Sequence, residues 1–228
     1  MKARFWVLVV VLLLTAQAAI AADDADVKEV VAGNNKLAFE LYGQLRTQPG
    51  NIVFSPYSVS AAFALAYAGA RGQTASEMEH VLHFSLGQEK IHPAMSSLMA
   101  DLQKRGNRDK NQLLIASALW GQKGFKFLPE FVKTASTFYK SGFEQVDFKK
   151  SPEDARKAIN TWAEKQTQGK ITDVLGQGSI DSMTRLVLAN AIFFDGKWES
   201  PFKAEHTRSG PFWLSPENQA DVPMMSQK

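Results

Sequence analysis

The chain has 228 residues, of which 45% are hydrophobic and 21% charged, with a formal net charge of +3. These proportions are ordinary for a globular protein and exclude wholesale disorder, a collagen helix and a coiled coil, while the length allows one large domain or two small ones. The absence of cysteine excludes disulfides, a thiol nucleophile, thiolate zinc sites and iron–sulfur clusters.

The first segment, residues 1–21, has the composition of a secretory signal peptide. Lys2 and Arg4 form a basic start, residues 5–14 are an unbroken apolar run of ten, and residues 19–21 read Ala-Ile-Ala, a small-x-small cleavage pattern. Ten apolar residues are too few to cross a bilayer, so a membrane anchor is disfavoured. We therefore expect a secreted protein, extracellular or periplasmic.

Removal of this segment changes how the charge is interpreted. The whole chain has 26 basic and 23 acidic residues, and this segment contains two of the basic residues and none of the acidic ones. The mature chain, residues 22–228, therefore carries a net charge of +1. A nearly neutral chain gives no support to a nucleic-acid or membrane partner.

The first part of the mature chain is predicted to be helical. Residues 27–46 have helical apolar spacing with one apolar face. A short strand is expected at residues 52–54, and the helix that opens at Ser58 is apolar nearly all round, which predicts burial on every side. Thr74 and Glu77 form a capping box that would start the next helix, and a weaker helix is expected from His92 to about Arg105.

Strands and helices then alternate. Residues 113–120 are expected to form a mostly buried strand, and Pro129 to open a helix. Residues 143–148 alternate loosely between apolar and polar side chains, which is typical of a strand. Ser151 and Pro152 form a strong helix start, and the helix that follows has one apolar face and one charged face.

Residues 186–194 are apolar on both faces except for Asn190, which predicts a central strand of a covered sheet. Asp195 and Gly196 are expected to turn the chain, and short extended segments broken by prolines follow. The predicted fold class is α+β, with a large mixed sheet covered by helices.

No enzyme motif emerges from the residues. The sequence lacks HExxH, GxSxG, P-loop and GxGxxG patterns, so we assign no catalytic residues and expect no cofactor. A metal site would need ligands from one helix face, but a solvated helix face is the favoured interpretation, and we assign no metal. The candidate ligands are Glu77, Glu79, His80 and His83.

Two other groups of side chains suggest ligands only weakly. A basic cluster could bind a polyanion such as a sulfated glycan, although a soluble loop beside a helix end is favoured. Three aromatic residues could line a pocket, although scattered aromatics more often belong to a core. The basic cluster is Lys104, Arg105, Arg108 and Lys110, and the aromatic residues are Trp198, Phe202 and Phe212.

Three long motifs occur in an order that resembles the serpin family of serine protease inhibitors. They are NIVFSPYSVSAAFALAYAGARGQTASEM (51–78), INTWAEKQTQGKITDVL (159–175) and LVLANAIFFDGKWESPF (186–202), the last followed by PFW and VPMM. The resemblance covers essentially residues 27–228. It implies that residues 22–228 are the N-terminal portion of a serpin domain.

The resemblance also implies roles in sheet gating. Ser55, Ser58 and Asn190 match the polar cluster beneath the centre of the main sheet, called the shutter. Trp198 and Thr207 match the top of the sheet, called the breach, where an inserting strand enters. A buried amide needs hydrogen-bond partners, which gives a physical reason for a polar residue within an apolar strand.

A serpin is cleaved by its target protease in an exposed loop, which then inserts into the main sheet as an extra strand. The implied function is therefore secreted inhibition of a serine protease, with cysteine proteases as a further class of target. The alternatives are a non-inhibitory serpin-like binding protein, an inactive truncated product and, far behind, a secreted hydrolase or metalloprotein.

The chain departs from the family pattern by stopping at Lys228, a little past half of a serpin domain. The resemblance implies that the reactive-centre loop is missing, so no residue here is the cleaved bond. The strand at residues 186–194 would then lack a neighbour on one side and expose an apolar edge. We expect residues 22–228 alone to be poorly soluble or molten.

Overall fold

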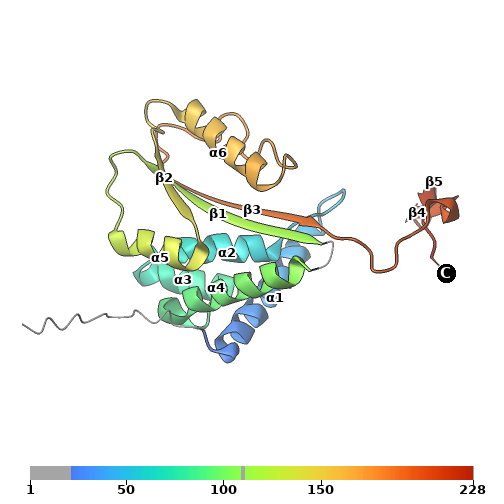
Figure 1. Cartoon of the computed structure of the whole chain (residues 1–228), viewed down its shortest axis with the longest axis horizontal. Helices are drawn as coiled ribbons and strands as arrows, with labels where there is room; N and C mark the ends of the chain where they lie inside the picture. The colour runs from blue at the N-terminus through green and yellow to red at the C-terminus, as the bar shows by residue number, and fades with distance from the viewer. Residues whose placement is uncertain (1–21, 109–110, 228) are drawn as a thin grey trace, which may run out of the picture.

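The computed structural model describes residues 22–108 and 111–227, so the predicted signal peptide lies outside the described residues. A helical layer lies against one face of a sheet and a single helix against the other, while a hairpin stands apart at the C-terminal end (Figure 1). The helical layer comprises α1 (Asp24–Leu45), α2 (Pro56–Tyr67), α3 (Gly72–Leu82), α4 (Gly87–Gly106) and α5 (Pro129–Tyr139), and the single helix is α6 (Pro152–Gln166). The strands are β1 (Gln112–Gln122), β2 (Gly142–Val146) and β3 (Leu186–Asp195), with the short helix η1 (Ala204–His206) before the hairpin of β4 (Arg208–Ser215) and β5 (Asn218–Met224).

The three-stranded sheet has the order β2-β1-β3. β1 pairs in parallel with β2 and antiparallel with β3, along nearly the whole length of β3. Within the described residues the strand at 186–194 therefore lacks a neighbour on one side, as expected, and does not take the central place that its apolar pattern alone predicted. β1 is central, and β3 lies at an edge of the sheet.

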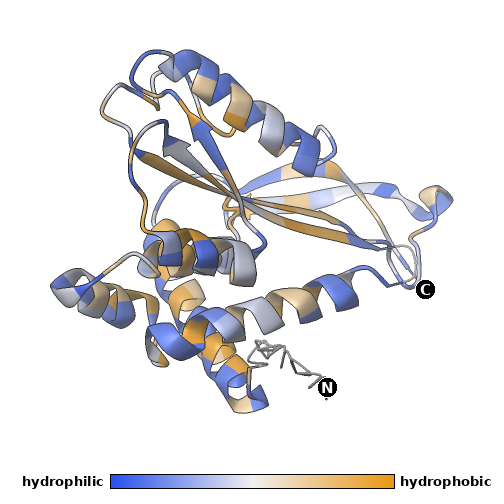
Figure 2. Ribbon diagram, turned by 60° about the vertical axis from the view of Figure 1, so that its left-hand side comes forward, coloured by the Kyte–Doolittle hydropathy of each residue, from blue (hydrophilic) through white to orange (hydrophobic). Residues whose placement is uncertain are grey.

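Side chains of β1 alternate between two hydrophobic clusters, as the period of a strand requires. Leu119 is fully buried in the larger cluster, among helices α1 to α5, whereas Ala118 and Trp120 belong to the smaller cluster beneath α6. Hydrophobic residues accordingly concentrate along the strands and on the inward sides of the helices (Figure 2). Within the described ranges, no helix has both the length and the hydropathy needed to cross a bilayer.

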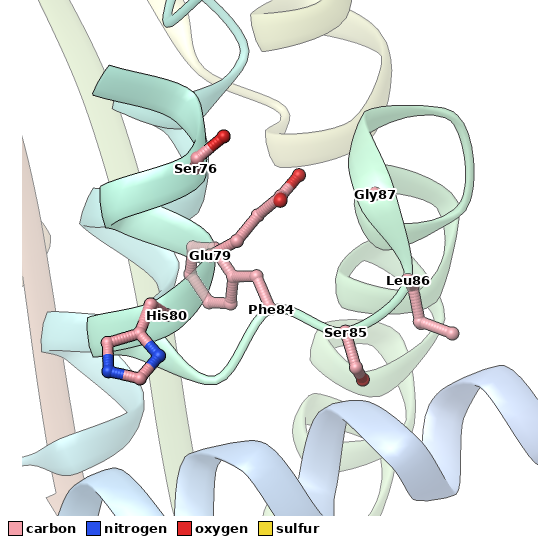
Figure 3. A pocket seen from close by; sticks show the side chains of 7 residues that line it. All are labelled: Ser76, Glu79, His80, Phe84, Ser85, Leu86 and Gly87. Carbon is pink, nitrogen blue, oxygen red and sulfur yellow. The ribbon is translucent and has the colours of Figure 1, made fainter. Parts of the chain in front are cut away.

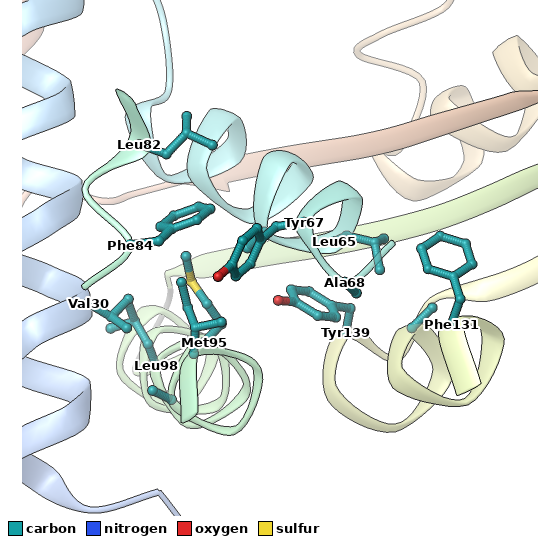
Figure 4. Packing of buried hydrophobic residues seen from close by; sticks show 14 of the residues in the cluster. Val30, Leu65, Tyr67, Ala68, Leu82, Phe84, Met95, Leu98, Phe131 and Tyr139 are labelled. Carbon is teal, nitrogen blue, oxygen red and sulfur yellow. The ribbon is translucent and has the colours of Figure 1, made fainter. Parts of the chain in front are cut away.

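The larger core contains a buried polar pair. His92 of α4 is 5% exposed, and its Nδ1 lies 2.7 Å from the Tyr139 hydroxyl of α5. Tyr67 of α2 lies beside Tyr139 in the same cluster (Figure 4). It packs against His92, and its hydroxyl donates to Glu79 of α3. These contacts tie four helices together through polar groups that need each other once water is excluded.

Three predicted elements differ from the observed ones in place or extent. Residues 52–54 form no strand, because a strand needs a hydrogen-bonding partner and no described strand pairs with them. The helix expected from a capping box at Thr74 begins at Gly72, so Thr74 is already inside it. α4 begins five residues before His92, with Pro93 inside the helix.

Other expectations hold only in part. α2 is not buried on every side, since Phe63 is 48% exposed. Ser151 is the N-cap of α6, but its side chain makes no capping bond. Asp195 and Gly196 do not form a hairpin turn, and the chain runs on from β3 in the same general direction (Figure 1).

Gly33 of α1 packs tightly against His83, the residue that follows α3. A Cβ at this position would lie 2.5 Å from the carbonyl oxygen of His83, whereas a Cβ at Gly43 of the same helix would meet nothing within 4 Å. We expect Gly33→Ala to destabilise the fold, and Gly43→Ala to stabilise it by about 0.5–1 kcal/mol through helix propensity. Urea unfolding of the two variants measures the difference, and equal effects would contradict the close packing.

Burial, together with a smaller contribution from the Arg71 guanidinium, lowers the pKa of His92 from 6.5 to about 4. Folding therefore favours the neutral imidazole, so its stabilising contribution is complete above pH 6.5 and is lost as the pH falls towards 4. The expected slope is about 1.4 kcal/mol per pH unit in that window. His92→Gln, which keeps a partner for Tyr139, should flatten the pH dependence of the unfolding free energy, and an unchanged slope would contradict the assignment.

Candidate functional site

The side of β3 that faces away from β1 has no partner strand within residues 22–108 and 111–227. A cavity of about 320 Å³ lies along it. The cavity passes around the edge of the sheet, because α2 covers one face, α6 the other, and both contribute to its walls. Its lining comprises Ser58, Val59, Ala62 and Phe63 of α2, Ile159 of α6, Val174 and Leu175 of the following loop, and residues 187–190 of β3.

Asn190 is held on the inner side of β3 by a cross-strand hydrogen bond. It lies opposite Ser117 of β1 in the strand register, and its Nδ2 donates to the Ser117 hydroxyl at 3.0 Å. Its Oδ1 is buried and has no partner among the described residues. The site therefore keeps one buried acceptor free, which costs stability unless another donor reaches it.

Ser55 and Ser58 lie at the start of α2, close to this cavity in the fold. The Ser55 hydroxyl caps the helix by accepting from the Ser58 amide at 3.2 Å, and Pro56 occupies the first turn. Ser58 and Asn190 line the same cavity. The structure thus brings Ser58 and Asn190 together and gives Ser55 a capping role beside them.

Sequence reasoning missed Ser117, which is the observed partner of Asn190. It is the single hydroxyl within residues 113–120, and that polar residue in a predicted buried strand was the available signal. The strand pairing needed to place it opposite Asn190 joins residues 73 apart in the chain.

The wall formed by α6 is attached through Asn160. Its side-chain amide donates to the Leu175 carbonyl at 2.9 Å and accepts from the Leu175 amide at 2.9 Å. Arg156 adds a bond to the same carbonyl at 2.7 Å and an ion pair with Asp173 at 3.0 Å. Because Leu175 also lines the cavity, these contacts fix its outer wall to α6.

Trp198 and Thr207 lie in the segment that follows β3. Trp198 is 66% exposed and meets Phe202 edge-on at 5.3 Å between ring centroids. Phe212 is 50% exposed on β4, so the aromatic residues form neither the core nor the pocket that were considered for them. Thr207 ends η1, where its amide bonds to Ala204.

The side chains considered as metal ligands are separated and engaged elsewhere. His83 pairs with Glu40 at 3.0 Å, Glu77 accepts from Gln73, and Glu79 accepts from Tyr67. The imidazole of His80 and the carboxylate of Glu79 point in different directions at an open pocket of about 540 Å³ (Figure 3). The described residues contain no group of three such side chains arranged to hold a metal ion.

The basic cluster is partly neutralised. Lys104 and Arg105 lie in the last turn of α4, and Arg105 pairs with Asp101 at 2.8 Å. Lys110 lies outside the described residues. A polyanion site at this end of α4 therefore gains no support from the geometry.

Comparisons with known proteins agree with this architecture. The family model Serpin (serine protease inhibitor) matches residues 32–228. The chain is 43% identical over 203 residues to the leukocyte elastase inhibitor of Bos taurus, covering 88% of this chain and 53% of that protein. Arabidopsis AtSerpin1, solved in a native stressed conformation, matches with a TM-score of 0.79 at 31% identity, over 89% of this chain and 52% of that one.

A loop-inserted structure of a cleaved ovalbumin mutant matches with a TM-score of 0.78 at 30% identity, over 86% of this chain and 55% of that one. The chain spans about half the length of these relatives. The resemblance inferred from the three motifs is confirmed, as is the α+β class with a mixed sheet covered by helices.

A double-mutant cycle tests the Asn190 contact. Ser117→Ala removes only the acceptor and should cost about 1–3 kcal/mol, because the buried Nδ2 of Asn190 loses its partner. Adding Asn190→Leu removes both polar partners and should recover much of that loss. Ser136→Ala, at an exposed serine of α5, is the control, and a Ser117→Ala effect no larger than the control would show that the bond contributes nothing.

Proposed function

Because the chain belongs to the serpin family, we propose that it is part of a secreted inhibitor of serine proteases that acts by inserting a cleaved loop beside β3. The observation that carries the proposal is the free outer side of β3, a ten-residue strand bordered by an apolar cavity. An extended segment entering there would hydrogen-bond to backbone groups that no described strand satisfies. Serpin loop insertion is an established example of such strand addition.

The energetics favour insertion once a loop has been cut. An intact loop is tethered at both ends and cannot extend along β3, whereas a cleaved loop is free at one end. Each backbone hydrogen bond gained contributes about 0.5–1.5 kcal/mol, and burial of apolar surface in the cavity adds about 25 cal/mol per Å². Addition of a strand of several residues is therefore favourable once the loop has been cut.

We assign gating roles to the residues around this edge. Ser55, Ser58 and Asn190 form the shutter beneath the sheet, and Asn190 Oδ1 offers an acceptor to a donor on the entering strand. Trp198 and Thr207, in the segment after β3, form the breach at which the strand enters. None of these residues is catalytic, and the proposed protein is not an enzyme.

The proposed target is a serine protease with elastase-like specificity, because a relative that is 43% identical carries the name leukocyte elastase inhibitor. Cysteine proteases are a further proposed class. The proposed location is extracellular or periplasmic, from the signal-peptide pattern of residues 1–21.

The test uses the protein exported by its natural source, recovered from the medium or periplasm with an expected N-terminus at Ala22. It is incubated with elastase and analysed by denaturing electrophoresis and intact mass. We expect a covalent complex that survives boiling in detergent, whereas elastase with a blocked active-site serine should form none. Cleaved protein, active elastase and no complex across a panel of serine proteases would refute inhibition.

The polyanion-binding alternative is tested on the same material. Because residues 22–228 carry a net charge of only +1 and Arg105 of the basic cluster pairs with Asp101, we expect this part of the chain to cause no strong retention on a heparin column. Strong retention without any protease complex would favour the non-inhibitory binding protein instead.

A further inference from the structure

A second cavity lies on the β2 side of β1, away from the cavity beside β3. It has a volume of about 260 Å³ and is lined by residues 115–117 of β1, by Gly142 at the start of β2, and by side chains of α4 and α6 and of the end of α5. These helices lie on both faces of the sheet, with α6 on one and α4 and α5 on the other (Figure 1). Every wall of this cavity therefore belongs to the part of the chain that the structure describes.

The charge of the cavity comes from one residue. Lys140 is the single charged side chain in the lining, which contains no Asp or Glu. Lys140 is exposed to solvent and forms no ion pair within residues 22–108 and 111–227. An ammonium group without a carboxylate beside it attracts an anion and repels a cation.

Lys140 occupies a backbone position that favours glycine. It caps the C-terminal end of α5 in the left-handed conformation, with φ 49°, and its amide bonds to the Ala135 carbonyl. Glycine adopts this conformation at the least cost, whereas a lysine there is strained. A glycine would therefore end the helix equally well, but it would bring no ammonium group to the cavity.

The aromatic part of the lining is Trp162 of α6. Its indole ring is partly buried and also packs against the smaller hydrophobic cluster, which holds it in place. Met99 of α4 and Ile115 of β1 add apolar surface to the same cavity. A ring face beside apolar side chains suits a flat, apolar ligand body.

Two side-chain amides of the lining keep unused hydrogen-bonding groups. Gln103 donates from Nε2 to the Ile115 carbonyl at 3.1 Å and leaves its Oε1 without a donor among the described residues. Gln166 of α6 lines the cavity, and the structure gives its amide no hydrogen bond within the described chain. A free carboxamide donates readily to a carboxylate oxygen and can orient it.

We propose that this cavity binds a small aromatic carboxylate, with the carboxylate at Lys140 and Gln166 and the ring beside Trp162. The volume lies below that of pockets for drug-sized ligands, so the ligand is no larger than two fused rings. The site is separate from the cavity beside β3, and its binding does not depend on the proposed protease inhibition. Ser117 lines it and also accepts from Asn190, so this one hydrogen bond separates the ligand from the shutter residues.

The test titrates 2-naphthoate into the full protein and its variants by isothermal calorimetry. We expect the parent to bind one naphthoate, and Lys140→Gly to bind it about fivefold more weakly or less, because the cation is lost. Lys140→Arg keeps the charge and should keep the affinity. Lys133→Gln removes an exposed lysine of the same helix that does not line the cavity, and it should leave the affinity unchanged.

Two further measurements separate binding from folding. Lys140→Gly should raise the midpoint of urea unfolding while it weakens binding, because glycine relieves the left-handed backbone. Uncharged 2-naphthamide should bind the parent protein about fivefold more weakly than naphthoate does, or less. Bound naphthoate should slow amide exchange in a peptide that spans residues 113–120.

Three results overturn the proposal. The first is the absence of saturable binding of naphthoate to the parent protein. The second is equal affinity of the parent and Lys140→Gly, or an equal loss in Lys133→Gln, which would show that the cavity lysine has no special part. The third is protection from exchange elsewhere but not at residues 113–120. If Lys140→Gly does not fold, the comparison of naphthoate with naphthamide on the parent protein decides.

Discussion

The antiparallel pairing of β1 with β3 is the contact on which the other features of this protein depend. It runs for ten residue pairs and joins segments about seventy positions apart in the chain. On one face of the pair α2 packs on β3 and α4 on β1, with the other helices of that layer packed around them, and the other face provides the surface for α6. The same register places Ser117 opposite Asn190, so the polar contact at the candidate site follows directly from the pairing.

The two outer sides of this strand pair differ in how their backbone groups are satisfied. Beyond β1, the edge is bonded by the parallel strand β2 and by two side-chain amides, those of Gln103 in α4 and of Asn107 just after it. Beyond β3, the described residues provide only a largely apolar cavity with one free buried acceptor, Asn190 Oδ1. Within the described residues, the backbone groups beyond β1 are therefore partly bonded, whereas those beyond β3 have no strand beside them.

Buried polar groups fix the relative positions of the elements as well as stabilising the fold. His92 and Tyr139 satisfy each other between α4 and α5, and Asn160 satisfies both backbone groups of Leu175 beneath α6. A buried amide or imidazole that finds its partner in only one arrangement fixes the relative placement of two elements. Asn190 is satisfied only in part, because its Oδ1 has no partner among the described residues, as is also true of Asn34 Oδ1, Ser60 Oγ and Trp120 Nε1.

The sequence by itself determined most of the elements and the family. Helical spacing and apolar runs located α1, β1, α5, α6 and β3, because the periods of helix and strand are local properties of the chain. The three ordered motifs indicated a serpin and picked out Asn190 as an isolated polar residue in an apolar strand. Element starts were less well predicted, since α3 begins two residues before Thr74 and α4 begins five residues before His92.

Only the tertiary structure decided which strand is central, which polar groups meet and which edge is covered. Ser117 becomes the partner of Asn190 through a register that no local pattern encodes. Asn107 reaches both backbone groups of Leu113 only because Gly106 allows α4 to approach that residue. These contacts join residues through the arrangement of whole elements in space, whereas the hydrophobic pattern specifies only which face of each element is buried.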